Sequence, residues 1–173
     1  MDTTDLGLVI VRLVVGLTFA AHGAQKAFGW WNGPGMPAWQ GVMERLGFRP
    51  TGLFAAVSMV AELGGGLLLA AGLLTPVAVA ALVGQLVVII LKSHLPRGFW
   101  NRDNGVEFPL SLAAGILAIG LIGPGGVSLD AALGLVPADA VRLGAIALGL
   151  VGGAAALALP SLRASSSEHA AQH

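Results

Sequence analysis

Three polar side chains, Arg12, Glu62 and Gln85, interrupt otherwise apolar stretches of this sequence. A cation near the centre of a bilayer costs at least about 2.5–3.5 kcal/mol, so a buried arginine normally turns inward and finds a carboxylate. Because Glu62 is the carboxylate deepest in another apolar stretch, we expect Arg12 and Glu62 to form a buried ion pair. Such a pair is either a static contact that fixes helix register or the deep part of a functional site.

A second group of polar residues lies near one end of the apolar stretches. Counted at 1.5 Å per residue from that end, Arg12 is roughly 20 Å deep and Glu62 about 15 Å, whereas His22 is about 6 Å deep. The shallow residues are His22, Lys26, Lys92, His94, Asn101 and Glu107, with Trp30, Trp31, Phe99 and Trp100 around them. We expect the two layers to form one pocket, open at this end. The alternative is that the shallow residues are ordinary interfacial anchors.

These residue types suit the binding of a quinone or a similar small aromatic molecule. Its ring would stack among aromatic side chains, and its carbonyl groups would accept hydrogen bonds from His22, Lys26 or Lys92. We assign catalytic, proton-handling roles to His22, Glu62 and Glu107. The other predicted ligand-binding residues are Arg12, Lys26, Trp30, Gln85, Lys92, His94 and Asn101.

The composition places these residues in a membrane. The 173-residue chain has a mean hydropathy of +0.83 and only 10% charged residues, against about 25% in an ordinary soluble domain. It has no cysteine and no net charge. We therefore expect no thiol chemistry, haem, iron–sulfur cluster or nucleic-acid binding. A metal site is not predicted either, because lysines stand beside the histidines, and redox chemistry would need a bound cofactor or a partner.

The apolar stretches predict an all-α, polytopic membrane protein. We expect spanning helices over residues 6–28, 53–74, 76–91, 109–122 and 138–159, and an interfacial helix over residues 38–46. The fourth stretch is short for a span and must lean on its neighbours or thin the bilayer. The predicted organisation is an antiparallel four-helix bundle over residues 1–130, an additional transmembrane helix over residues 131–160 and a disordered tail over residues 161–173.

Positive charges are unevenly distributed between the two ends of this bundle. The first and third loops share a side, because two helices lie between them. That side carries seven of the nine lysines and arginines, namely Lys26, Arg45, Arg49, Lys92, Arg97, Arg102 and Arg163. The positive-inside rule therefore predicts that this side and the C-terminus are cytoplasmic and that the N-terminus is outside.

Several short motifs follow one another in a fixed order along the chain. They are His22-Gly23-Ala24-Gln25-Lys26, Phe28-Gly29-Trp30, Ala61-Glu62-Leu63-Gly64-Gly65-Gly66, His94, Gly98-Phe99-Trp100-Asn101 and Gly105-Val106-Glu107-Phe108-Pro109. Together they closely resemble the DoxX family of bacterial and archaeal membrane proteins, over about residues 6–130. The resemblance implies a four-helix core in a bacterial cytoplasmic (inner) membrane. It also implies a link to quinol oxidases, thiosulfate:quinone oxidation, redox homeostasis or detoxification.

The leading prediction is an accessory redox subunit that binds quinone in the bilayer and acts with a redox partner protein or as a homo-oligomer. Activity of the chain in isolation is not expected. One alternative is a small-molecule or proton-coupled transporter, although the turn at residues 74–76 offers little polar lining for a second opening. Another is a non-catalytic assembly subunit that docks through Gly149 and Gly153, which have GxxxG spacing.

Overall fold

The described chain is a bundle of long helices. The computed structural model describes residues 2–170, and their side chains through Ala158. The helices are α1 (Thr3–Phe28), α2 (Gly35–Arg45), α3 (Thr51–Ala71), α4 (Thr75–Val88), α5 (Glu107–Ile122), α6 (Leu129–Ala132) and α7 (Asp139–Ala170). The predicted all-α class, the five long helices and the interfacial helix are confirmed. The predicted tail, residues 161–173, lies outside the residues with described side chains.

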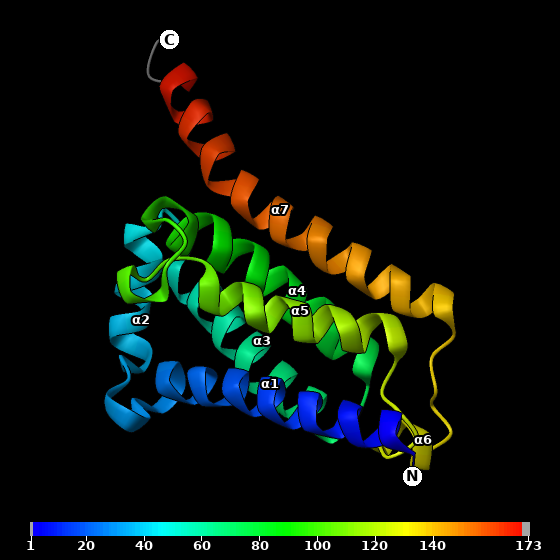
Figure 1. Cartoon of the computed structure of the whole chain (residues 1–173). Helices are drawn as coiled ribbons and strands as arrows, with labels where there is room; N and C mark the ends of the chain where they lie inside the picture. Colours follow the sequence, from blue (N-terminus) through cyan, green and yellow to red (C-terminus); the bar gives the residue numbers. More distant parts are fainter. Residues whose placement is uncertain (1, 171–173) are drawn as a thin grey trace.

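The helices alternate in direction around a common core (Figure 1). α1 packs on α3, α3 on α4, α4 on α5 and α5 on α1, which closes a four-helix ring, while α7 lies outside against α4 and α5. α2 crosses one end of the ring, and α6 lies at the other. We call these the α2 end and the α6 end. As predicted, the first and third loops share the α2 end.

Most of these helices are long and apolar enough to span a bilayer. Within the described residues, four meet that criterion: Thr3–Phe28, Thr51–Ala71, Thr75–Arg97 and Asp139–Ala158. The apolar helix α5 has only 16 residues, about 24 Å at 1.5 Å per residue, and therefore depends on its neighbours. The chain is a multi-pass membrane protein.

The last turn before the third loop departs from α-helical geometry. Ile89–His94 continues α4 as a π-helix, and the 3₁₀ turns Leu95–Arg97 and Asn101–Asp103 follow it. The sequence did not predict this wider turn. π-helical turns occur frequently at functional sites, and this one carries Lys92 and His94.

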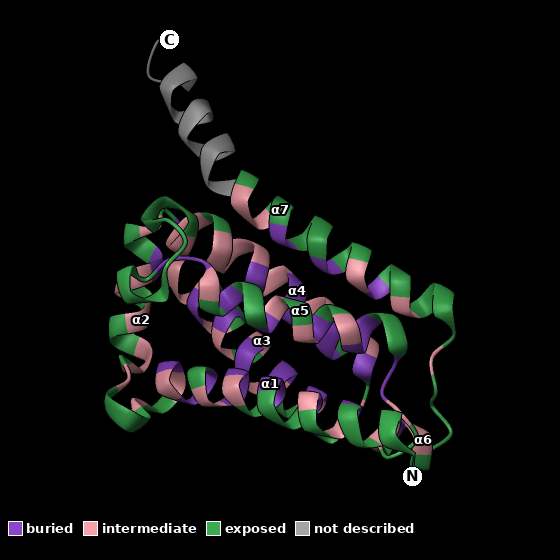
Figure 2. Ribbon diagram, viewed as in Figure 1, coloured by how far each residue is buried: buried purple, intermediate pink, exposed green. Residues whose placement is uncertain are grey.

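The core of the ring is apolar and contains side chains from all four helices. Its fully buried members include Leu69 of α3, Leu82 of α4 and Ile116 of α5, which surround Phe19 of α1. A second cluster around Phe48 packs beneath α2 and attaches that helix to α3. Figure 2 shows buried inward faces on the ring helices and a largely exposed α7 up to Ala158.

Glycines allow two pairs of helices to pack backbone against backbone. A Cβ atom on Gly66 would lie 2.5 Å from the Ala20 nitrogen of α1. On α7, a Cβ on Gly149 would lie 2.7 Å from the Ala80 oxygen, and one on Gly153 would lie 2.7 Å from the Gly84 oxygen. The prediction that Gly149 and Gly153 form a docking face for another subunit is therefore wrong. Both face α4 of their own chain, because small residues permit this close approach.

Candidate functional site

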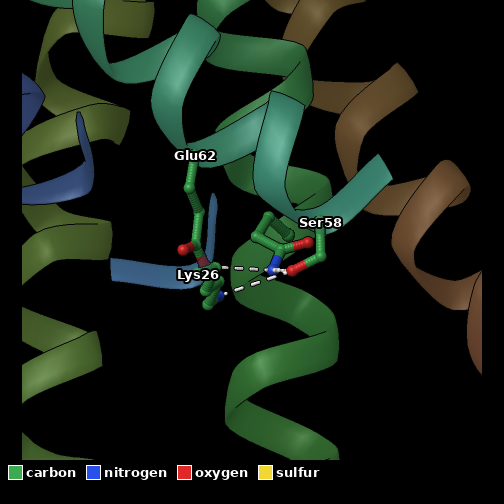
Figure 3. A network of polar contacts seen from close by, with 4 residues as sticks. Lys26, Ser58 and Glu62 are labelled. Atoms are coloured by element: carbon green, nitrogen blue, oxygen red, sulfur yellow. Dashed lines mark hydrogen bonds and ion pairs between the residues drawn. The ribbon is translucent and has the colours of Figure 1, made fainter. Parts of the chain in front are cut away.

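A buried polar network joins α1, α3 and α4 near the α2 end (Figure 3). Lys26 Nζ donates to Glu62 Oε1 at 2.5 Å and to Ser58 Oγ at 3.4 Å. Gln85 Nε2 donates to Ser58 Oγ at 2.7 Å and to Glu62 Oε1 at 3.0 Å. The Lys26 ammonium also lies over the ring of Trp39 from α2, 4.1 Å from its centroid. The predicted neighbourhood of Glu62 and Gln85 is confirmed, but Lys26 is the cation that completes it.

The direction of the side chains explains why Lys26 reaches Glu62. In an α-helix, Cα–Cβ bonds tilt toward the N-terminus. α1 runs toward the α2 end and α3 runs away from it. Lys26 consequently leans back into the bundle, and Glu62 leans toward the α2 end, so the two side chains converge.

Arg12 lies at the opposite end of the bundle and does not pair with Glu62. Its Nη1 donates to the Pro124 carbonyl and its Nη2 to the Val127 carbonyl, both at 2.6 Å. The carboxylate that interacts with it electrostatically is Asp130. The predicted Arg12–Glu62 pair is therefore wrong, because each side chain leans toward the N-terminus of its own antiparallel helix and the two diverge.

Asp130 is part of this arrangement at the α6 end. It is buried and accepts hydrogen bonds from the Leu74 nitrogen at 2.7 Å and the Thr75 nitrogen at 2.9 Å. The carboxylate thereby caps α4, whose first N–H groups have no partner within the helix. Arg12 and Asp130 together hold the loop after α5 against the helices. Arg12 therefore lies away from Glu62 and does not line the polar cavity beside it.

Two buried polar atoms of the network lack a partner. Among the described protein groups, nothing hydrogen-bonds to Glu62 Oε2 or to Trp39 Nε1. The Glu62 side chain is only 2% exposed. A buried polar group without a partner is expensive, about 1–3 kcal/mol or more for a charged group. Such groups mark a position where a ligand, water or proton can bind.

Glu62 and Trp39 both line a polar cavity of about 550 Å³ between α1, α2, α4 and α5. Its volume falls within the range of about 300–1,000 Å³ that is usual for small-molecule sites. Its polar and charged lining consists of His22, Lys26, Arg45, Glu62, Lys92, Ser93, His94 and Arg97. Its aromatic lining consists of Phe19, Trp39 and Phe108. The cavity thus combines an apolar, aromatic wall with a few convergent polar groups.

The charges around this cavity are unbalanced. Glu62 is its one acidic lining residue in the described part of the chain, and Lys26 already pairs with it. The mouth carries Arg45, Lys92 and Arg97, for which the described residues provide no ion pair. A cavity lined by cations and partly shielded from water favours an electron-rich or anionic ligand.

The predicted shallow layer is only partly assembled. His22, Lys26, Lys92 and His94 line the polar cavity. The ring centroids of His22 and Phe108 lie 6.0 Å apart in an edge contact. His94 Nδ1 lies 2.7 Å from the Asn104 carbonyl, which fixes its ring against the third loop. Four of the six predicted shallow residues therefore lie around the cavity.

The remaining predicted residues lie outside the polar cavity. Glu107 Oε2 accepts a hydrogen bond from the Asn101 nitrogen at 2.9 Å, so these two residues close the third loop on itself. Trp30 is 55% exposed and contacts Phe28 and Trp31. The prediction that the loop aromatic residues surround the pocket is wrong. All four of them project outward, namely Trp30, Trp31, Phe99 and Trp100. They occupy positions typical of interfacial anchors.

Sequence reasoning missed several contributors to the site, including Trp39 of α2. Ser58 stands one helical turn before Glu62, and that spacing on one face was an available signal. Arg45 and Arg97 had been counted only as loop charges, and Phe108 only as part of a motif. No sequence signal shows that Arg45, Arg97 and Phe108 turn toward the cavity. Within the described residues, no group of three histidines, cysteines or carboxylates gathers to hold a metal ion.

Comparison with known proteins places the chain among membrane proteins. The DoxX family model matches residues 7–95, a shorter stretch than the motifs predicted. A relative from Mycobacterium tuberculosis (strain ATCC 25618 / H37Rv), named only as an uncharacterized membrane protein, is 34% identical over 134 residues. That match covers 71% of this chain and 78% of the relative. No solved structure matches the chain.

Proposed function

This chain belongs to the DoxX family of membrane proteins, and we propose that it binds a quinone or a similar small aromatic redox molecule in the polar cavity, as an accessory subunit of a membrane oxidoreductase. The observation that carries the proposal is the Glu62 carboxylate. It is buried at the cavity wall with Oε1 bonded to Lys26 and Gln85 and with Oε2 free of any described partner.

The cavity fits a flat ring with oxygen substituents. Phe19, Trp39 and Phe108 supply aromatic surface against which a ring can stack. Lys92 and Arg97, at the mouth, carry N–H donors for carbonyl oxygens. The free oxygen of Glu62 supplies an acceptor for a hydroxyl group.

When bound, a quinone would supply the two-electron, two-proton chemistry that the protein side chains lack. The chain itself has no cysteine, so electrons would come from a partner protein or a second bound molecule. The residues of the chain would bind the ring, exclude water and hold protons. Glu62 is placed to accept a proton at Oε2, and His22, whose ring lines the same cavity, is placed to exchange one with the mouth.

The alternatives receive less support from the geometry. A transporter must open to both faces, but Arg12 ties the loop after α5 across the α6 end through Pro124 and Val127. An assembly subunit would need no cavity with a buried, unpartnered carboxylate. The assembly alternative predicts that a ring compound binds no better than it partitions into lipid, whereas a transporter would also carry its ligand across a liposome membrane.

Calorimetric titration with a chainless benzoquinone tests the proposal on protein in nanodiscs. Phe108→Ala removes an aromatic wall of the cavity, and Phe99→Ala is its matched control outside the cavity. We expect Phe108→Ala to weaken binding about 2- to 12-fold, the equivalent of 0.5–1.5 kcal/mol for an aromatic contact, and Phe99→Ala to have no effect. Glu62→Gln should also weaken binding of the corresponding hydroquinone.

A charge-matched pair supplies a second comparison. Arg97→Ala removes a cation from the cavity mouth, whereas Arg102→Ala removes an exposed cation from the same loop, with 82% of its side chain accessible. Arg97→Ala should weaken binding about tenfold or more, as for a hydrogen bond from a charged donor. Equal dissociation constants for the wild type and all these variants would refute the proposed site.

We further propose that the α2 end faces the cytoplasm of a bacterial inner membrane, because the unpaired cations Arg45, Lys92 and Arg97 lie there. The cysteine-free sequence makes single-cysteine labelling direct. An impermeant maleimide applied to whole cells should label Leu133→Cys, at the α6 end, but Asn101→Cys only after permeabilisation. The reverse pattern would invert the proposed orientation.

A further inference from the structure

A second hollow, the apolar groove, opens beside the polar cavity. It has a volume of about 290 Å³ and lies between α2, α3, α4 and α7. Val57 of α3 and Leu148 of α7 line it and are more than half exposed, at 56% and 66%. Because both residues lie on membrane-spanning helices, the groove opens toward the lipid.

The apolar groove and the polar cavity are neighbours with common walls. Both are lined by Trp39 of α2, by Leu46 directly after α2, and by Ile89 and Ser93 of the π-helical turn. The buried network also lies between them, since Ser58 and Gln85 line the groove while Lys26 and Glu62 line the cavity. The two hollows therefore adjoin each other at α2 and the π-helical turn.

The helix outside the ring keeps this groove open. Gly149 and Gly153 bring α7 into backbone contact with α4, so α7 forms one wall. Gly152 lies on the groove side, and no atom lies within 4 Å of a Cβ built on it. A Cβ atom at that position would therefore meet open space at the groove wall.

From these observations we infer that the apolar groove binds the hydrocarbon chain of the ligand whose ring occupies the polar cavity. The inference rests on the proposed function and assigns the ligand class: an amphipathic aromatic with an alkyl or isoprenoid chain. The aromatic and charged lining of the cavity matches the ring, and the apolar, lipid-facing lining of the groove matches the chain. α7, which lies beyond the residues matched by the family model, thereby becomes a wall of the binding site.

Photolabelling in nanodiscs tests the inference with a benzoquinone whose alkyl chain ends in a diazirine. In the wild type, label should concentrate on peptides from the groove walls in α3, α4 and α7. Gly152→Leu fills the groove and should reduce that label at least fivefold. Gly144→Leu is the matched control, since Gly144 lies on the same helix, is equally open and does not line the groove.

Two further arms separate this inference from the proposed function. The chainless benzoquinone should bind the wild type, Gly152→Leu and Gly144→Leu with the same dissociation constant. If it binds none of them, the proposed function fails and the inference fails with it. If it binds all three but Gly152→Leu leaves the label unchanged, only the chain assignment fails.

The occupant of the groove is tested with a fatty acid that carries the same diazirine but no ring. Labelling of the groove by this probe as efficiently as by the ring compound would identify a bilayer lipid as the occupant and overturn the inference. Ala156→Leu, also on the groove wall of α7, replaces Gly152→Leu if the latter does not assemble in the membrane.

Discussion

Removal of Lys26 alone should destabilise the protein far more than removal of Lys26 and Glu62 together. The two side chains are only 11% and 2% exposed, and their charged atoms lie 2.5 Å apart. Loss of one partner of a buried ion pair typically costs about 3–5 kcal/mol, because the other charge stays buried, whereas replacement of both by apolar residues is often neutral or stabilising.

The structure places Lys26→Met at the lower end of that range. Glu62 Oε1 would keep its hydrogen bond from Gln85 at 3.0 Å, so the remaining carboxylate would not be wholly unpartnered. We expect a loss of about 3 kcal/mol in the free energy of unfolding, or about 6–12 °C in melting temperature for a chain of this length. Addition of Glu62→Leu should recover most of it.

The assay is reversible unfolding in mixed micelles of fixed composition, arranged as a double-mutant cycle. Arg12→Met supplies the comparison, because Arg12 bonds to carbonyl groups at the α6 end. Its effect should add to that of Glu62→Leu, whereas the effects of Lys26→Met and Glu62→Leu should not add. The network would be refuted if Glu62→Leu restored the stability lost in Arg12→Met while the stability losses of Lys26→Met and Glu62→Leu simply added.

Two further predictions concern the packing of the bundle. Gly66→Ala should destabilise it by about 1–3 kcal/mol in the same unfolding assay, because the new Cβ would lie 2.5 Å from the Ala20 nitrogen. Gly64→Ala should be neutral, because its Cβ would meet nothing nearer than 4.0 Å. Arg12→Lys should raise hydrogen exchange in the loop after α5, since one ammonium cannot reproduce a guanidinium that bridges two carbonyls at 2.6 Å; unchanged protection there would contradict the proposed clamp.

The local chemistry of the sequence was enough to predict the helices and their order. Long apolar stretches separated by Gly, Pro and polar residues marked five long helices, and the observed boundaries lie within a few residues of the prediction for most of them. Amphipathic spacing also marked α2. The π-helical turn at Ile89–His94 and the short helix α6 were not predicted.

The polar residues show where sequence reasoning reached its limit. Depth along the helices correctly brought Glu62 near Gln85, because rise per residue is fixed by the backbone. The same depth comparison predicted Arg12 as the partner of Glu62. It was misleading because it locates only Cα atoms, and the side chain of Lys26 extends several ångströms from its Cα atom. It also could not determine that Trp30 turns outward while Trp39 turns inward, because loop conformation decides this.

The sequence by itself therefore determined that this is a membrane bundle with buried charges that must be satisfied inside it. The tertiary structure alone decided which charges meet. Because side chains tilt toward the N-terminus of each helix, antiparallel neighbours bring Lys26 and Glu62 together and carry Arg12 away to the loop at the α6 end. The same packing left one carboxylate oxygen unpartnered beside a cavity, and no pattern in the sequence encodes that coincidence.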